Sequence, residues 1–260
     1  MTNRKTWKTG LSIGILSEEA LQNAAKAGLD LVEINGIDDE NHWKDVPLWE
    51  QQTGVKVWSV HLPFCGPGID RPDDPEELWC TTRPVQRALI EGGGIAGIKH
   101  MVIHGSGESS QLADPELREV RFQRSLERLA ELSAMCKENG STLCVEVLPR
   151  YCLGNCSDEI QRYMDHIPDL RLCFDVNHLL KEDHVEFVKK VGKYAITTHI
   201  SDYDFEDEKH WFPLEGQIDW KELQSALESV DYNGPFLYEV SMAGHTWEDV
   251  KKNHEQLKNL

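Results

Sequence analysis

The sequence has few basic residues and no long apolar run. No stretch of 18 or more residues is uninterruptedly apolar, so we expect no transmembrane helix. The apolar run 11–16 is too short for a signal peptide, and acidic residues follow it at once, so we expect a cytoplasmic protein. Its 27 Lys and Arg stand against 45 Asp and Glu, a net charge of −18. This excess of acidic residues argues against nucleic acid and membrane surfaces as partners.

The cysteines show neither a disulfide framework nor a zinc-finger pattern. There are seven, an odd number, and Cys144 and Cys173 lie in apolar, strand-like runs. Cys152 and Cys156 are not part of a CxxC pair and have no metal-ligating partners at zinc-finger spacing. We interpret the first two as buried free thiols in a reducing compartment and the second two as loop residues.

Short apolar segments alternate with helix-patterned segments along the whole chain. The segments are nearly continuously apolar, which is typical of parallel strands buried on both faces. We expect strands at 10–15, 29–35, 55–64, 99–104, 142–148, 170–176, 196–201 and 235–240. Capping residues and helical periodicity predict helices at 17–28, 84–97, 115–140, 157–166, 181–192, 219–230 and 246–260.

This alternation predicts a single α/β domain over residues 1–260, without a linker. Eight strands and this length fit a closed (β/α)8 TIM-type barrel with a parallel eight-stranded core. The competing fold is an open doubly wound sheet, which usually carries a glycine-rich nucleotide turn after an early strand. The glycines at 92–94 lie inside a helical pattern instead, where a kink or close packing explains them better.

Metal-competent side chains stand near the carboxyl ends of seven expected strands, where TIM barrels place their chemistry. A charged or imidazole side chain in an apolar strand is costly to bury unless it is paired or metal-bound. Glu146, Asp175, His199 and Glu239 form the strongest set. Three carboxylates and one imidazole favour one divalent ion, Mn²⁺, Mg²⁺ or Co²⁺ first, with Zn²⁺ also compatible. The other strand-end residues are Glu33, His61, His104 and His178.

The motifs at these strand ends resemble a known superfamily. They are Cys-Val-Glu146-Val-Leu-Pro-Arg150, Asp175-x-x-His178, His199-x-x-Asp202, the segment His210 to Trp220, and Leu-Tyr-Glu239-Val-Ser. In this order they resemble the xylose-isomerase-like barrels, and within them the sugar phosphate isomerase/epimerase group. The resemblance covers nearly the whole chain and is specific for the superfamily, but it does not specify a substrate.

The resemblance implies a metal-dependent isomerase or epimerase of a sugar or sugar derivative. In ketose 3-epimerases of this group the equivalents of Glu146, Asp175, His199 and Glu239 bind one divalent metal. The two glutamates also transfer the proton, through a metal-stabilised cis-enediolate, and the equivalent of His178 contacts the substrate. These epimerases tend to carry Arg six residues after the metal-binding histidine, whereas this chain has Phe205. The usual sugar contacts are therefore not all expected.

Other reactions use the same kind of site. A polyol dehydratase or a hydroxypyruvate-type isomerase would need the same ligands, and a non-catalytic barrel could retain them. The chain also resembles endonuclease IV, a trinuclear zinc enzyme acting on abasic DNA. His61 and His104 match its histidines, while Glu208-x-His210 departs from its Asp-x-His pair at the first position. The charge of −18 opposes this alternative.

Further residues are expected to contact a small-molecule carbohydrate. His61 and His104 are candidate pocket residues, and Trp211 beside His210 could stack on the apolar face of a sugar. Arg150 could hold an anionic group or pair with a carboxylate. Glu33 belongs either to the floor of the pocket or to an ion pair inside the barrel. Trp58 and Phe64 are expected near the same face, and homo-oligomer formation stays open.

Overall fold

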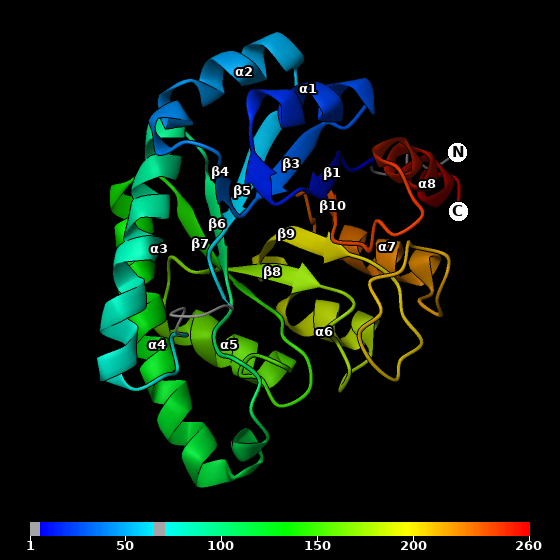
Figure 1. Ribbon diagram of the computed structural model, residues 1–260. Coiled ribbons are helices and arrows are strands. Elements are labelled where there is room, and N and C mark those ends of the chain that lie inside the picture. Colours follow the sequence, from blue (N-terminus) through cyan, green and yellow to red (C-terminus); the bar gives the residue numbers. More distant parts are fainter. Residues whose placement is uncertain (1–5, 65–70) are drawn as a thin grey trace.

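The computed structural model describes residues 6–64 and 71–260 (Figure 1). Within these residues, eight parallel strands close into a barrel in the order β1-β10-β9-β8-β7-β6-β5-β3. The predicted barrel is therefore confirmed, and each predicted strand range overlaps one barrel strand. The strands are β1 (Thr9–Ser12), β3 (Leu31–Ile34), β5 (Lys56–His61), β6 (His100–Ile103), β7 (Thr142–Glu146), β8 (Arg171–Asp175), β9 (Ala195–Ile200) and β10 (Phe236–Tyr238).

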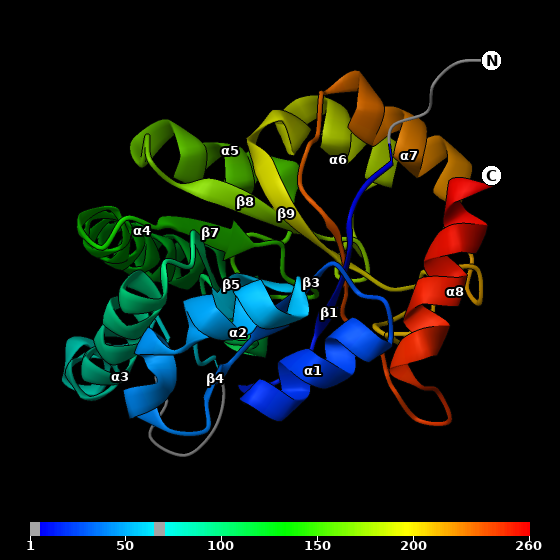
Figure 2. The ribbon, with the colours of Figure 1, turned by 90° about the horizontal axis from the view of Figure 1, so that it is seen from above.

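A helix follows each barrel strand, and together the helices surround the barrel (Figure 2). None of the helices in the described ranges is both long and apolar enough to cross a bilayer. A small sheet, β2 (Ile15–Leu16) with β4 (Gly36–Ile37), lies beside the barrel. The helices are α1 (Glu18–Lys26), α2 (Val46–Thr53), α3 (Glu76–Ala96), α4 (Pro115–Glu138), α5 (Ser157–His166), α6 (His184–Val191), α7 (Trp220–Ser229) and α8 (Trp247–Lys258).

Two helix positions differ from the sequence expectation. Helix α2 was not predicted, although Pro47 in its first turn and Gly54, with φ of 76° at its C-cap, are both typical boundary residues. Helix α3 begins at Glu76, so the predicted start at Pro84 is wrong and that proline lies inside the helix. The acidic first turn after Pro75 starts this helix because it complements the helix dipole.

The glycine cluster in α3 is a packing site. A Cβ atom on Gly92 would overlap the indole of Trp43, and one on Gly93 would overlap Met101. These glycines let α3 approach the segment before α2 and the strand β6. The interpretation as close packing, rather than as a nucleotide-binding turn, is confirmed.

Alternation along the strands explains which side chains enter the barrel. Residues two apart on a strand share one face. Val102, Cys144 and Cys173, from β6, β7 and β8, form a small buried cluster apart from the main core, which confirms both thiols as buried and free. Two residues further along β7 and β8 come Glu146 and Asp175. The same alternation that fills the barrel thus gathers polar side chains at its carboxyl end.

Candidate metal centre

Four side chains from neighbouring strands converge at the carboxyl end of the barrel. Glu146 ends β7, Asp175 ends β8, His199 lies in β9 and Glu239 follows β10. One ligand atom from each lies within 4.8 Å of the others. His199 Nδ1 is 3.3 Å from Glu146 Oε1, 3.3 Å from Glu239 Oε2 and 3.8 Å from Asp175 Oδ2. The structure therefore brings together all four residues that the sequence singled out as a ligand set.

The atoms that face one another in this cluster lack hydrogen bonds. Glu146 Oε1, Asp175 Oδ2 and His199 Nδ1 are buried, and none has a hydrogen-bond partner among the described residues. Leaving such atoms unpaired costs about 1–3 kcal/mol each, so native structures normally satisfy them. Three carboxylates and an imidazole nitrogen are ligands suited to a divalent cation. The residues present fit such an ion.

Glu146 lies at the centre of a ring of imidazoles. Its Oε2 atom is 2.9 Å from His61 Nε2 and 3.3 Å from His104 Nε2, and its Oε1 atom is 3.3 Å from His178 Nδ1. Burial alone would raise the pKa of Glu146, but the charge of His199 and contacts with His104 and His178 hold it well below its usual value. Glu146 is therefore a carboxylate before any ion binds.

The same cluster shifts the pKa values of its other members. Burial raises the pKa of Asp175 to about 7, although the charge of His178 opposes this. Burial would lower the pKa of His178, yet Asp175 and Glu146 raise it to about 10. Without a cation, protons on the imidazoles balance the carboxylates. Binding of a divalent ion would replace part of that positive charge and release protons.

A carboxylate lies next to the Nε2 atom of His199, on the side opposite its Nδ1 atom. Glu33 Oε1 lies 2.9 Å from His199 Nε2, and the hydroxyl of Ser59 donates to Glu33 Oε2 at 2.6 Å. This contact is an ion pair without hydrogen-bond geometry, and the Nδ1 atom of the same ring faces the cluster. Of the two alternatives for Glu33, the ion pair inside the barrel is the one observed.

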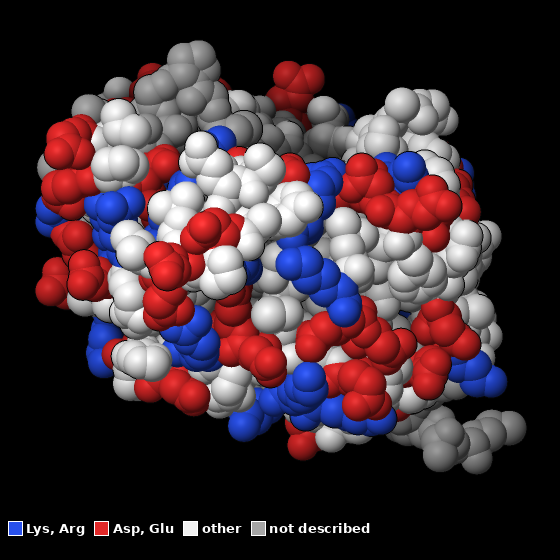
Figure 3. Space-filling model, turned by 90° about the horizontal axis from the view of Figure 1, so that it is seen from below, with Lys and Arg blue, Asp and Glu red and all other residues white. Residues whose placement is uncertain are grey.

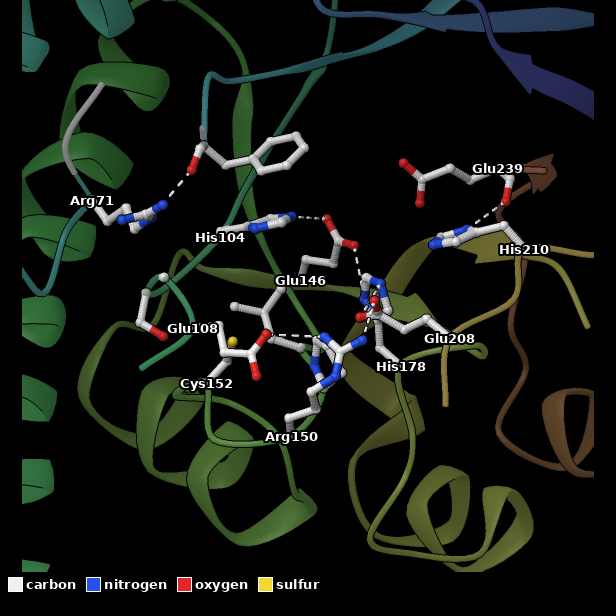
Figure 4. Close-up of a pocket in the computed structure, with 15 residues that line it drawn as sticks. Arg71, His104, Glu108, Glu146, Arg150, Cys152, His178, Glu208, His210 and Glu239 are labelled. Carbon is white, nitrogen blue, oxygen red and sulfur yellow. Dashed lines mark hydrogen bonds and ion pairs between the residues drawn. The ribbon is translucent and has the colours of Figure 1, made fainter. Parts of the chain in front are cut away.

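A cavity of about 290 Å³ opens above the cluster (Figure 4). The ring of Phe64 stacks on His104 with centroids 4.1 Å apart, as expected for an aromatic side chain near this face. Of the six predicted substrate-contacting residues, His104, His178, His210 and Arg150 line the cavity. The lining comprises Phe64, Arg71, His104, Ser106, Gly107, Glu108, Glu146, Leu148, Pro149, Arg150, Cys152, His178, Glu208, His210 and Glu239.

Three aromatic residues are placed differently from the prediction. His61 is 2% exposed and lies beneath the cavity against Glu146, so it is not a lining residue. Trp211 also does not line the cavity and is 38% exposed. Its backbone forms a β-bridge with Asp202, and because side chains alternate along extended backbone, His210 faces the cavity and Trp211 does not. The ring of Trp58 lies against that of His100 at the start of β6, with centroids 4.3 Å apart and away from the carboxyl ends of the strands, so its predicted position is wrong.

Arg150 is surrounded by carboxylates. Its guanidinium lies 2.7 Å from Asp207 Oδ1, 3.0 Å from Glu208 Oε2 and 3.0 Å from Glu108 Oε2. Its backbone has φ of 48°, a left-handed conformation, and its carboxylate partners come from the loops after β6 and β9. Of the two roles left open by the sequence, pairing with carboxylates is the one observed.

A second group of potential ligands lies on the cavity wall. One ligand atom each from His178, Glu208 and His210 falls within 4.8 Å of the others, and His178 Nε2 is 3.4 Å from Glu208 Oε1. His61, Glu146 and His199 form a third such group. His178 and Glu146 thus connect the four-residue cluster to further imidazoles.

The sequence analysis assigned no role to three residues of this region. Asn177 Oδ1 accepts the backbone N–H groups of Lys209 and His210, which supports the left-handed backbone of His210. Asp202, noted only as part of a motif, accepts from Trp220 Nε1 and three backbone N–H groups and is structural. Arg71 lies in a segment rich in Pro, Gly and Asp, where no periodic pattern points to a role.

Comparison with known proteins places the chain in context. The family model described as xylose isomerase-like TIM barrel matches residues 21–260. A D-psicose 3-epimerase of Ruminiclostridium cellulolyticum is 25% identical over 139 residues, which are 50% of this chain and 45% of that protein. The chain spans about half the length of the curated relatives it matches.

Solved structures with the same fold cover nearly the whole chain. The 3-keto-D-glucoside 4-epimerase YcjR of E. coli has a TM-score of 0.78 at 17% identity, over 97% of this chain and 100% of that one. The IolI protein, solved with a bound zinc atom, has a TM-score of 0.76 at 18% identity, over 95% and 96% of the two chains. At these identities the likeness establishes the fold.

Proposed function

Because the chain belongs to the xylose isomerase-like TIM barrel family, we propose that it is a divalent-metal-dependent isomerase or epimerase of a sugar or sugar derivative. The observation that carries the proposal is the convergence of Glu146, Asp175, His199 and Glu239 beneath one cavity. The epimerase names of the similar proteins support the same reaction class. The proposal takes the chain as one domain, since the barrel strands run from Thr9 to Tyr238.

The four clustered residues would hold the ion. Bound there, a divalent cation would act as a Lewis acid toward the carbonyl group of a hydroxy-carbonyl substrate. His199 and Asp175 are ligands in this proposal and take no part in proton transfer. Glu33 supplies a negative charge beside the ring of His199.

Glu146 and Glu239 carry the proton transfer. Both line the cavity, and they come from β7 and from the end of β10, with β8 and β9 between them. One carboxylate removes the proton from the carbon beside the carbonyl, and the other returns a proton. Return to the opposite face of that carbon epimerises it, whereas return to the neighbouring carbon interconverts aldose and ketose. Two carboxylates flanking one substrate serve either outcome.

His178 is placed to donate to a substrate oxygen. Its Nδ1 atom lies 2.9 Å from the carbonyl oxygen of Val147, which favours a proton on that nitrogen. Its Nε2 atom faces Glu208 on the cavity wall. A ring protonated at both nitrogens would donate from Nε2 and stabilise charge on the carbonyl oxygen.

Variants of the two glutamates test the proposal. Positioned acid and base groups contribute about 10²–10⁴-fold each, so Glu146→Gln and Glu239→Gln should each lose at least about two orders of magnitude in kcat/KM. Activity is measured on a panel of ketoses and aldoses with Mn²⁺. The matched control is Glu138→Gln, an exposed position on α4. Full activity in either cavity variant removes that glutamate from the mechanism, and a product lacking one water indicates a dehydratase.

A second function, abasic-site endonuclease, is favoured by one observation. The three groups of potential ligands, two of which share Glu146 and His199, could hold more than one ion. The net charge of −18 argues against this function. In the described part of the face shown in Figure 3, acidic side chains also lie among the basic ones. We expect no incision of an abasic duplex above background at physiological salt. Robust incision that is lost in His61→Ala or His104→Ala would establish the nuclease and overturn the sugar reaction.

A further inference from the structure

The carboxylates that line the cavity already have cationic partners. Glu108 and Glu208 pair with Arg150, Glu146 with several imidazoles, and Glu239 with His199. Arg71 also lines the cavity, but no described carboxylate lies within ion-pair distance of its guanidinium. A guanidinium stays charged at any physiological pH. Arg71 is therefore a cation on the cavity wall without an anion opposite it.

The side chain of Arg71 is held in place by contacts that leave part of its donor group unused. Its Nε atom donates to the carbonyl oxygen of Phe64 at 3.2 Å. The guanidinium lies against Gly107, where a Cβ atom would overlap Nε and Cζ. No described residue accepts from its two terminal nitrogens, and two parallel donors of this kind match a carboxylate or a phosphate.

The backbone around Arg71 is anchored to α4. Its N–H group donates to Asp74 Oδ2 at 2.9 Å, and Asp74 Oδ1 lies 3.3 Å from Arg121 Nη2. Asp73 pairs with the same Arg121 and accepts from the N–H group of Gly107 at 3.3 Å. Both aspartates beside Arg71 thus pair with Arg121, and neither is an ion-pair partner of the Arg71 guanidinium.

We propose that Arg71 forms an anion subsite, so that the substrate is a sugar derivative carrying a carboxylate or a phosphate. This inference rests on the proposed function, because the reacting end of the same molecule would lie at the acidic cluster. Arg71 and Glu239 lie on opposite sides of the cavity (Figure 4). The anionic group would therefore be remote from the reacting carbonyl, and Arg71 would select and orient the substrate.

The subsite can be tested without any sugar. Inorganic phosphate is titrated into the protein in EDTA and followed by ³¹P NMR. Arg71→Gln should weaken binding about 10- to 100-fold, the range for a hydrogen bond to a charged group. Arg87→Gln, an exposed control on α3, should bind as the wild type does. Equal binding by wild type and Arg71→Gln overturns the subsite.

A matched set of ligands then tests the substrate class. D-fructose, D-fructuronate and D-fructose 6-phosphate differ only at carbon six, and calorimetry with Mn²⁺ compares their affinities. Wild type should bind one of the anionic ligands at least about tenfold more tightly than fructose, and the stronger one identifies the anion. Arg71→Gln should lose this preference and keep its affinity for fructose. Gly107→Ala, which displaces the arginine without removing it, should weaken the preference too.

The outcomes separate the two proposals. Turnover of neutral sugars without any anion preference leaves the proposed function standing and overturns the subsite. An Arg71-dependent preference without turnover supports the subsite and contradicts the proposed reaction. Absence of binding by all three ligands contradicts both.

Discussion

Replacing Asp175 by Asn should stabilise the metal-free protein and remove most of the stabilisation that a bound metal ion adds. Asp175 is fully buried, and its Oδ2 atom has no described hydrogen-bond partner. Its Oδ1 atom accepts the backbone N–H groups of Asn177 and His178 at 2.7 and 3.2 Å. An asparagine Oδ1 can keep these two hydrogen bonds. The substitution also removes one negative charge from the cluster, and it places an N–H donor at the position of Asp175 Oδ2.

The size of the effect follows from the spacing of the cluster. At 4.8 Å, the widest separation among the ligand atoms, two unit charges repel by about 3 kcal/mol at an effective dielectric constant of about 20. The nearby imidazoles offset part of this repulsion, so metal-free Asp175→Asn should be about 1–3 kcal/mol more stable than wild type. A metal ion at a concentration of about 100 times its Kd adds about 2.7 kcal/mol to the free energy of unfolding of wild type. The variant lacks a ligand and should gain much less.

Urea unfolding at pH 8, in EDTA and in Mn²⁺, measures both effects. Burial raises the pKa of Asp175 to about 7, so the carboxyl is ionised at this pH. Asp202→Asn is the control, because this buried carboxylate accepts from Trp220 Nε1 and backbone N–H groups instead of facing the cluster. It should lose stability in both conditions and keep the gain from Mn²⁺. The reasoning is refuted if Asp175→Asn is the less stable protein in EDTA, or if it gains as much from Mn²⁺ as wild type.

Two further predictions concern the stability of the barrel. Burial lowers the pKa of His254 to about 4 from 6.5, so the neutral folded form loses stability as the pH falls through the unfolded-state value. Between pH 7 and pH 5, the free energy of unfolding of wild type should fall by about 2 kcal/mol more than that of His254→Gln. The glutamine can still donate to the carbonyl oxygen of Trp7, so this hydrogen bond is kept in the variant. Equal losses of the two proteins in urea unfolding would contradict the prediction. Gly92→Ala should lower the free energy of unfolding by about 1–3 kcal/mol, because the added Cβ overlaps the buried indole of Trp43. An unchanged urea midpoint would refute the packing argument.

The barrel could be predicted because its strands are short, apolar and regularly spaced. Burial on both faces gives a parallel strand a nearly continuous apolar sequence, and this signal was correct for all eight. Helix α2 was missed because only Val46 and Trp49 of its side chains are buried, too few for a clear periodicity. The start of α3 was misplaced because Pro84 was interpreted as a first-turn residue, whereas it is tolerated inside the helix.

The ligand cluster could be predicted because strand ends meet at one edge of a barrel. Polar residues at the ends of β7, β8, β9 and β10 are thereby neighbours in space without being neighbours in sequence. No comparable rule predicts where the side chains of the loops around the cavity lie. The left-handed backbone of Arg150 turns it toward three acidic residues, and the bridge between Asp202 and Trp211 turns the tryptophan away. Arg71 depends on a close approach to Gly107 that no local pattern indicates.

Turnover in deuterated water tests the central claim, proton transfer by Glu146 and Glu239, most directly. The Mn²⁺-loaded protein is incubated with an active substrate, and ¹H NMR and mass spectrometry follow the carbon beside the carbonyl. The account predicts that solvent deuterium enters that carbon during turnover. It also predicts that Glu146→Gln and Glu239→Gln each slow the exchange by at least about two orders of magnitude while Glu138→Gln does not. Product formed without any solvent deuterium would contradict the account, because the hydrogen would then move as a hydride and neither carboxylate would carry it.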